Sequence, residues 1–206
     1  DYLYDKVGMY DCLRGVIRGK RPASSITHEW QEVDDIRDHM LYFLENHDEQ
    51  RIASDFFCGD AMKAIPAAAM SLFFQKNPFM LYSGQEFGER GMDKEGFSGV
   101  DGRTTIFDYW SPVTLAQAYQ HALPKTVNKT GAGRKTDDLT PEQKYLAATY
   151  RQMLRLANEE KAIREGDTFD LMYVNPGSDH FDPRTNFAFL RKKEEEVLLV
   201  VLNFSI

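Results

Sequence analysis

The residues best suited to chemistry form a polar cluster that follows a short apolar run. The run is Met40–Leu44, and the residues after it are Glu45, Asn46, His47, Asp48 and Glu49. A short, bounded apolar run predicts a strand that is buried on both faces. Because α/β proteins build their sites at the carboxyl ends of such strands, the cluster is a candidate site. The structural alternative is that Asn46 or Asp48 caps a helix beginning near Glu49.

Composition restricts the class of protein. The chain has 206 residues, 42% of them apolar, and a formal net charge of −7. This charge argues against a nucleic-acid partner, because binding to phosphate requires clustered Lys and Arg. No apolar run approaches the roughly 20 residues of a membrane span, and no leader sequence is evident. Since the chain opens with Asp1 rather than Met, we expect a processed product or a piece of a longer protein.

Cysteine and histidine give no metal signature. Cys12 and Cys58 lack CxxC spacing, so we expect two small buried side chains. The histidines outside the cluster, at positions 28, 39, 121 and 180, have no spacing typical of metal ligands. The sequence therefore predicts no metal and no cofactor.

Strands and helices are expected to alternate in the first part of the chain. The hydrophobic pattern predicts strands at 2–4, 40–44 and 79–82 and helices at 8–18, 30–39 and 61–75, with a loop over 20–29. The helix at 61–75 is nearly apolar all round and should be buried. This alternation favours βα units around a parallel sheet.

The second part of the chain begins with a Gly- and Asp-rich loop. It covers 87–110, and loops of this length are usually functional or mobile. A short helix over 111–122 and an exposed loop over 124–138 should follow. Thr140-Pro141-Glu142-Gln143 is a strong helix start. The helix should reach about Asn158 and bury these residues: Tyr145, Leu146, Tyr150, Met153, Leu154 and Leu156.

The pattern changes to antiparallel strands near Gly166. We expect strands at 168–174, 186–191 and 196–203, joined by turns. A domain boundary is therefore predicted at about this residue.

Three motifs, in order, resemble glycoside hydrolase family 13, the α-amylase family. Phe43-Leu44-Glu45-Asn46-His47-Asp48 resembles the family's seventh barrel strand, and Tyr82-Ser83-Gly84-Gln85-Glu86-Phe87-Gly88 resembles the eighth. The tail from Tyr150 to Asn203 resembles the last barrel helix and the start of the family's β-sandwich. The resemblance implies an α/β chain: the last three βα units of a (β/α)8 TIM barrel over residues 1–165, then a small antiparallel β-domain over 166–206.

By the same resemblance, the chain lacks the first five barrel strands. The family's nucleophilic Asp and acid/base Glu lie after the fourth and fifth of these strands, and no Gly-Phe-Arg-x-Asp motif occurs here. Carried over, Asp48 is an essential carboxylate that holds the 2- and 3-hydroxyls of the sugar, and His47 donates to the same hydroxyls. Asn46 is expected to orient the turn or touch sugar. Arg51 is expected to reach a carboxylate or substrate, or to be solvated.

The resemblance implies part of a retaining α-glycoside hydrolase acting on α-glucans such as starch, glycogen or malto-oligosaccharides. The alternatives are an α-glucan transglycosylase or branching enzyme of the family, or a non-catalytic glycan-binding or interaction module. The 206-residue chain alone is expected to be inactive. Calcium occurs in the family, but its ligands would lie mainly in the missing part. Open barrel edges predict self-association, and the compartment is undetermined, although a secreted or periplasmic parent is compatible with the resemblance.

Overall fold

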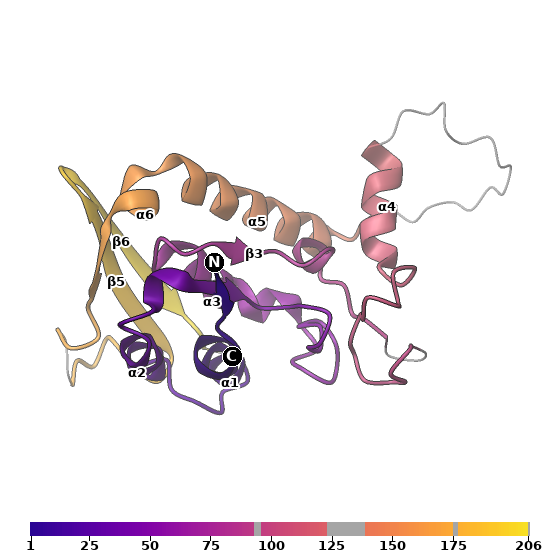
Figure 1. The fold of residues 1–206 in the computed structure, drawn as a ribbon, viewed down its shortest axis with the longest axis horizontal. Coiled ribbons are helices and arrows are strands. Elements are labelled where there is room, and N and C mark those ends of the chain that lie inside the picture. Colours follow the sequence, from indigo (N-terminus) through magenta and orange to yellow (C-terminus); the bar gives the residue numbers. More distant parts are fainter. Residues whose placement is uncertain (93–95, 123–138, 175–176, 206) are drawn as a thin grey trace, which may run out of the picture. The chain divides into compact units, whose positions relative to one another are not determined.

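The computed structural model describes residues 1–92, 96–122, 139–174 and 177–205. The loop expected over 124–138 lies outside these ranges. Figure 1 traces the helices and strands along the chain. The chain divides into two compact units. The first comprises Asp1–Leu44, Met62–Leu81 and Arg151–Ile206, and the second comprises Glu45–Ala61 and Tyr82–Tyr150. The boundary expected near Gly166 is a different division, based on the resemblance, and it stays a prediction.

A parallel three-stranded sheet lies in the first unit. Its strands are β1 (Leu3–Tyr4), β2 (Met40–Phe43) and β3 (Phe79–Met80), in the order β1-β2-β3. Leu3 pairs with Met40, and Tyr42 pairs with Phe79. The central strand β2 is almost wholly buried, as its apolar sequence predicts. All three strands therefore run in the same direction, and the polar cluster follows β2 directly in the chain.

Helices connect these strands, which confirms the predicted alternation. A π-helical turn (Lys6–Tyr10) and α1 (Asp11–Ile17) follow β1. A 3-10 turn (Ala61–Ala64) and α3 (Ile65–Phe73) follow β2. Seven of the nine residues of α3 are buried, as expected for a helix that is apolar all round.

One helix differs from the prediction. The loop expected over 20–29 is wrong, because α2 occupies Ser25–Glu32 and only a 3-10 turn, Arg37–His39, follows it. A segment far away in the sequence fixes the start of α2, because the amides of Ala23 and Ser24 donate to the carbonyls of Arg184 and Pro183. Its end precedes two consecutive aspartates, whose charge is unfavourable at a helix carboxyl terminus.

The described residues of the second unit are mainly loop, as predicted for 87–110, of which the structure describes 87–92 and 96–110. A 3-10 turn (Gln85–Phe87) precedes the loop, α4 (Val113–Ala122) follows it, and an isolated antiparallel bridge joins Gln50 to Arg103.

Helix α5 (Pro141–Glu159) begins where the sequence predicts. Thr140 Oγ1 accepts from the Gln143 amide, and Gln143 Oε1 accepts from the Thr140 amide. This is a reciprocal capping box. Leu146, Tyr150 and Met153 are buried as expected, but Tyr145 and Leu156 are 60% and 43% exposed. Their predicted burial is wrong, because they lie off the packed stripe of the helix.

The strands β4 (Asp167–Asp170), β5 (Asn186–Lys193) and β6 (Glu196–Asn203) form an antiparallel sheet. They follow α6 (Lys161–Glu165) and pair in that order. The first strand ends earlier than predicted, because Asp170 Oδ1 accepts from the Met172 amide and turns the chain. Among the residues described, no helix is long and apolar enough to cross a membrane.

Candidate functional site

The polar cluster forms a closed loop after β2. Glu45 and Arg51 are each 1% exposed, and Arg51 Nη1 lies 2.7 Å from Glu45 Oε2. The other carboxylate oxygen, Oε1, accepts from the Ile52 amide at 2.8 Å. The two ends of the loop are therefore joined by a buried ion pair and a backbone hydrogen bond. A charge-assisted contact of this kind is short and directional.

Arg51 also attaches this loop to the second long loop of the same unit. Its Nε donates to Thr104 Oγ1 at 3.0 Å, its Nη2 donates to the Ser83 carbonyl at 2.9 Å, and its backbone amide donates to the Gly102 carbonyl at 2.8 Å. The guanidinium also lies 4.4 Å from the ring centre of Tyr82. The approach of the two loops is close, because a Cβ on Gly91, whose φ is +73°, would lie 2.9 Å from Arg51 Cγ.

These contacts correct the expectation for Arg51. It is not solvated, because protein groups surround its guanidinium. The expected contact with a carboxylate is present, and that carboxylate is Glu45. Because the side chain is buried, it offers no surface to a ligand in this structure. Its contacts are those of a residue that positions the loop.

Burial dominates the electrostatics beneath the loop. Desolvation raises the pKa of Glu45, and the Arg51 guanidinium and the Ile52 amide act in the opposite direction. Desolvation likewise raises the pKa of the Tyr82 phenol, again opposed by Arg51. The positive charge of Arg51 thus favours the ionised forms of Glu45 and Tyr82, which burial disfavours.

Asn46 shapes the turn. Its Oδ1 accepts from the amides of Asp48 at 2.8 Å and Glu49 at 3.0 Å, and the residue is 5% exposed. These contacts agree with the expectation that Asn46 orients the turn. The alternative of a helix cap is wrong, because the next helical segment of the chain begins at Ala61.

His47 and Asp48 are the polar side chains at the tip that reach solvent. They are 41% and 71% exposed, and His47 Nε2 lies 3.3 Å from Asp48 Oδ2. The pair presents an acceptor carboxylate and an imidazole side by side. Such groups can bind neighbouring hydroxyls of one ligand, because the carboxylate accepts and the ring nitrogen donates. The structure brings together all four expected residues, 46, 47, 48 and 51, with two exposed and two buried.

Sequence reasoning missed the supports of the loop. Glu45, Ser83 and Thr104 hold Arg51, and Asp108 orders the aromatic segment beyond it. Asp108 is 2% exposed and accepts from Thr105 Oγ1 at 2.6 Å and from the Phe97 amide at 2.8 Å. The one sequence signal that could have revealed these supports is Glu45, a glutamate at the end of an apolar strand. A buried carboxylate requires a partner.

Gln85 Nε2 donates to Tyr150 Oη at 2.9 Å. No group of three or more His, Cys, Asp or Glu residues that could hold a metal occurs in the described ranges.

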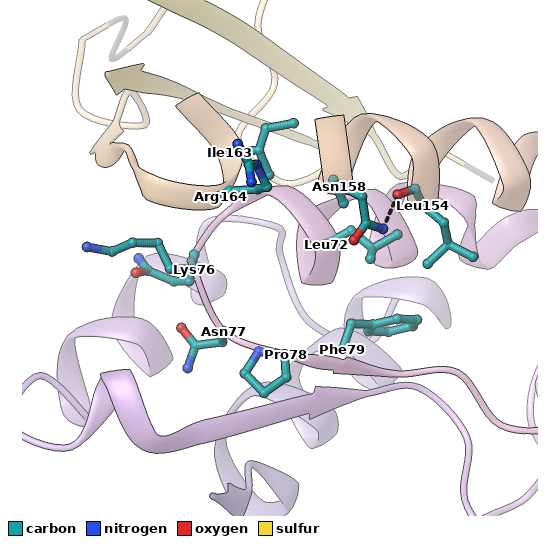
Figure 2. Close-up of a pocket in the computed structure, with 11 residues that line it drawn as sticks. Leu72, Lys76, Asn77, Pro78, Phe79, Leu154, Asn158, Ile163 and Arg164 are labelled. Carbon is teal, nitrogen blue, oxygen red and sulfur yellow. Dashed lines mark hydrogen bonds between the residues drawn. The ribbon is translucent and has the colours of Figure 1, made fainter. Parts of the chain in front are cut away.

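A cavity of about 420 Å³ lies elsewhere, in the first unit (Figure 2). Asn77, Pro78 and Phe79 line one side, at the amino end of β3, and α5 and α6 line the other. Lys76 and Arg164 are the charged residues of this lining. Lys76 follows the carboxyl terminus of α3 and Arg164 lies in the last turn of α6, which is the usual place for cations near helix ends. The cavity does not include any residue of the loop that carries Asp48.

No family model matches the chain, and no curated protein matches it. Solved structures do. A maltogenic α-amylase, AmyB from Thermotoga neapolitana, matches at 18% identity with a TM-score of 0.58, over 99% of this chain and 38% of that one. The Nostoc punctiforme debranching enzyme matches at 13% identity with a TM-score of 0.61, over 98% and 37%. Isomaltulose synthase from Erwinia rhapontici matches at 19% with a TM-score of 0.53, over 95% and 41%.

The chain therefore spans about two fifths of the length of these enzymes. At identities of 13–19%, the TM-scores of 0.53–0.61 establish similarity of the fold alone. The solved structures it resembles are enzymes of the α-amylase family, so the resemblance to glycoside hydrolase family 13 is confirmed at the level of the fold.

Proposed function

We propose that this chain is part of a retaining α-glycosidase that acts on α-glucans, and that Asp48 and His47 hold the sugar at the cleavage point. The observation that carries the proposal is the exposed His47–Asp48 pair at the tip of a loop braced by Asn46 and the Glu45–Arg51 ion pair. The loop follows a parallel strand, where α/β folds place their sites. The AmyP structure in complex with maltose and the Nostoc enzyme soaked with acarbose are among the similar folds.

The chemistry of glycoside hydrolysis gives the pair its role. Retaining hydrolysis uses two carboxyl groups and passes through an oxocarbenium-like transition state. A fixed carboxylate that binds ring hydroxyls more strongly in this state accelerates the reaction. Asp48 would serve as that third carboxylate, and its charge would disfavour ionisation of a neighbouring acid/base Glu. His47 would donate to the same hydroxyls.

In this proposal, residues 1–165 are three βα units of a TIM barrel and residues 166–206 begin a β-sandwich domain. We assign no nucleophile and no acid/base residue in the 206 residues. The pure chain should therefore give no turnover of soluble starch, and measurable turnover would contradict this assignment. Coding sequence upstream of Asp1 with Gly-Phe-Arg-x-Asp and a later strand-borne Glu would favour catalysis by the longer protein.

Transglycosylation is the second candidate. It has specific support, because a cyclomaltodextrin glucanotransferase and isomaltulose synthases are among the structures with a similar fold. Water and a sugar hydroxyl compete as acceptors for the same intermediate, so the two reactions share the role given to Asp48. Product analysis of the longer protein, with maltoheptaose as both donor and acceptor, separates them.

The role of the pair can be tested on the chain itself. Maltoheptaose should shift the backbone amide signals of residues 46–49 in a 15N NMR titration, and Asp48→Asn should remove the shifts. The matched control is Asp34→Asn, because Asp34 is similarly exposed at 72% and likewise lies beside a nitrogen-bearing side chain, that of Arg37. Shifts that persist in Asp48→Asn, or that vanish equally in Asp34→Asn, would refute the proposed contact.

A further inference from the structure

A second groove lies in the first compact unit, between α2 and the edge strand β4. Its volume is about 530 Å³, and it is open to solvent. One wall consists of residues from one stripe of α2, and the other consists of β4 and the turn after it. Figure 1 shows α2 beside the end of β5, next to which β4 pairs. The residues that line the groove are Ser24, Thr27, Trp30, Gln31, Thr168, Phe169, Asp170, Met172 and Tyr173.

Both carboxylate oxygens of Asp170 accept hydrogen bonds at the groove. Thr27 Oγ1 donates to Asp170 Oδ2 at 2.5 Å, and this contact joins the two walls across 143 positions of sequence. The other oxygen, Asp170 Oδ1, accepts from the Met172 amide at 2.7 Å. Asp170 is 9% exposed. A site built on such fixed groups loses little conformational entropy when a ligand binds.

Other polar groups on the walls remain available. Ser24 is the residue before α2, but its hydroxyl makes no capping hydrogen bond. Gln31 is exposed on the same stripe. Thr168, in contrast, is committed, because its hydroxyl bonds the Phe74 carbonyl and accepts from Arg191. The groove therefore offers the Ser24 hydroxyl and the Gln31 amide to a ligand, together with the remaining lone pairs of Asp170 and the phenol of Tyr173.

Aromatic side chains supply the apolar surface. Tyr173 and Phe169 are 76% and 47% exposed, and Trp30 also lines the groove. Among the described residues that line the groove, Asp170 is the only charged one, and none is a cation that could bind an anion. Aromatic faces beside hydroxyl, amide and carboxylate groups suit a neutral ligand with an apolar face and a rim of hydroxyls, which describes a sugar ring.

We propose that this groove is a second carbohydrate-binding site, which takes a segment of α-glucan with a sugar ring against Tyr173 and its hydroxyls on Gln31, Ser24 and Asp170. That the sugar is an α-glucan rests on the proposed function. The site itself does not depend on Asp48, because every residue that lines it belongs to the other compact unit. Binding here is non-catalytic and anchors polymeric substrate to the protein.

Tryptophan fluorescence tests the proposal directly. The chain has two tryptophans, so Trp110→Phe leaves Trp30 as the only reporter. Titration of this variant with maltoheptaose should change the Trp30 emission with a saturable isotherm. Tyr173→Ala and Gln31→Ala should each weaken binding about two- to tenfold, the range expected for one stacking or hydrogen-bond contact. Tyr145→Ala is the control, because this tyrosine is 60% exposed but lies outside the groove.

Asp48→Asn separates this inference from the proposed function. A Trp30 signal that is retained in Asp48→Asn and weakened in Tyr173→Ala supports the groove. A silent Trp30, with NMR shifts at residues 46–49 that Asp48→Asn removes, overturns the groove and leaves the proposed function standing. A response to choline chloride without one to maltoheptaose also overturns it, because aromatic residues around a carboxylate would then be a cation site. Equal weakening by Tyr145→Ala has the same consequence.

Discussion

Replacement of Arg51 by Met tests whether the buried ion pair holds the candidate site together. Glu45 and Arg51 are 1% exposed, so solvent screens their interaction little. The replacement leaves the Glu45 carboxylate buried and unpaired, which costs about 3–5 kcal/mol. For a chain of this size, a melting temperature falls by about 2–4 °C per kcal/mol. We therefore expect the chain to melt about 6–20 °C lower at pH 7.

The loss of stability in Arg51→Met should be smaller at low pH than at pH 7. Desolvation raises the pKa of Glu45 and Arg51 opposes it, so loss of Arg51 raises this pKa further. An acid whose pKa is higher in the folded state than in the unfolded state stabilises the fold most at low pH, and this stability is lost as the pH rises toward the folded-state pKa. The deficit of Arg51→Met relative to the parent should therefore shrink as the pH falls from 7 to 5, by up to about 1.4 kcal/mol per unit.

Arg191→Met is the matched control. Arg191 is also fully buried, but it donates to the carbonyl oxygens of Phe74, Ala162, Ile163 and Gly166. These acceptors do not titrate, and burial lowers the pKa of Arg191 only to about 10. Its removal should destabilise the protein equally at pH 5 and pH 7.

A double variant, Glu45→Gln with Arg51→Met, should recover much of the loss, because no charge stays buried and Gln still accepts from the Ile52 amide. Urea and thermal unfolding followed by circular dichroism at pH 5, 6 and 7 measure all of these effects. A shift below about 2 °C for Arg51→Met, or a deficit independent of pH, would refute the reasoning.

Three further predictions follow from the described residues. Asn46→Ala removes the acceptor of two loop amides and should cost about 1–2 kcal/mol, with faster hydrogen exchange at those amides as the measurement; unchanged exchange would contradict it. Burial alone would raise the pKa of Asp108, but hydrogen bonds led by Thr105 Oγ1 hold it below its usual value. Asp108→Asn should therefore destabilise the protein above the unfolded pKa, about 4, and the loss should fade as the pH drops through the folded pKa; a constant loss from pH 3 to 7 in urea titrations would argue otherwise. The edge strand Leu3–Tyr4 is 56% and 51% exposed at its two residues, so we expect self-association; a monodisperse monomer in light scattering, with cooperative melting above ~60 °C, would exclude it.

The sequence predicts best where a local rule acts alone. The strand at Glu196–Asn203 has the bounds that alternation predicts, and the Thr140–Gln143 capping box forms as the spacing requires. The predictions that are wrong depend on contacts with distant parts of the chain. The start of α2 depends on carbonyls about 160 positions away, and the exposure of Tyr145 depends on which stripe of α5 finds a partner. Periodicity within a short window contains neither kind of information.

The candidate site shows the same division. An arginine next to a turn is usually solvated. Arg51 is buried instead, because it contacts Thr104, 53 positions away, and the buried Glu45. Because these buried groups hold the loop from below, His47 and Asp48 can stay exposed without losing their orientation. Groups that are already oriented before the ligand binds lose less conformational entropy on binding and on reaching the transition state. Arg51→Met should thus weaken maltoheptaose binding at residues 46–49 even though Arg51 touches no sugar, and at low pH, where Glu45 binds a proton, part of that binding should return.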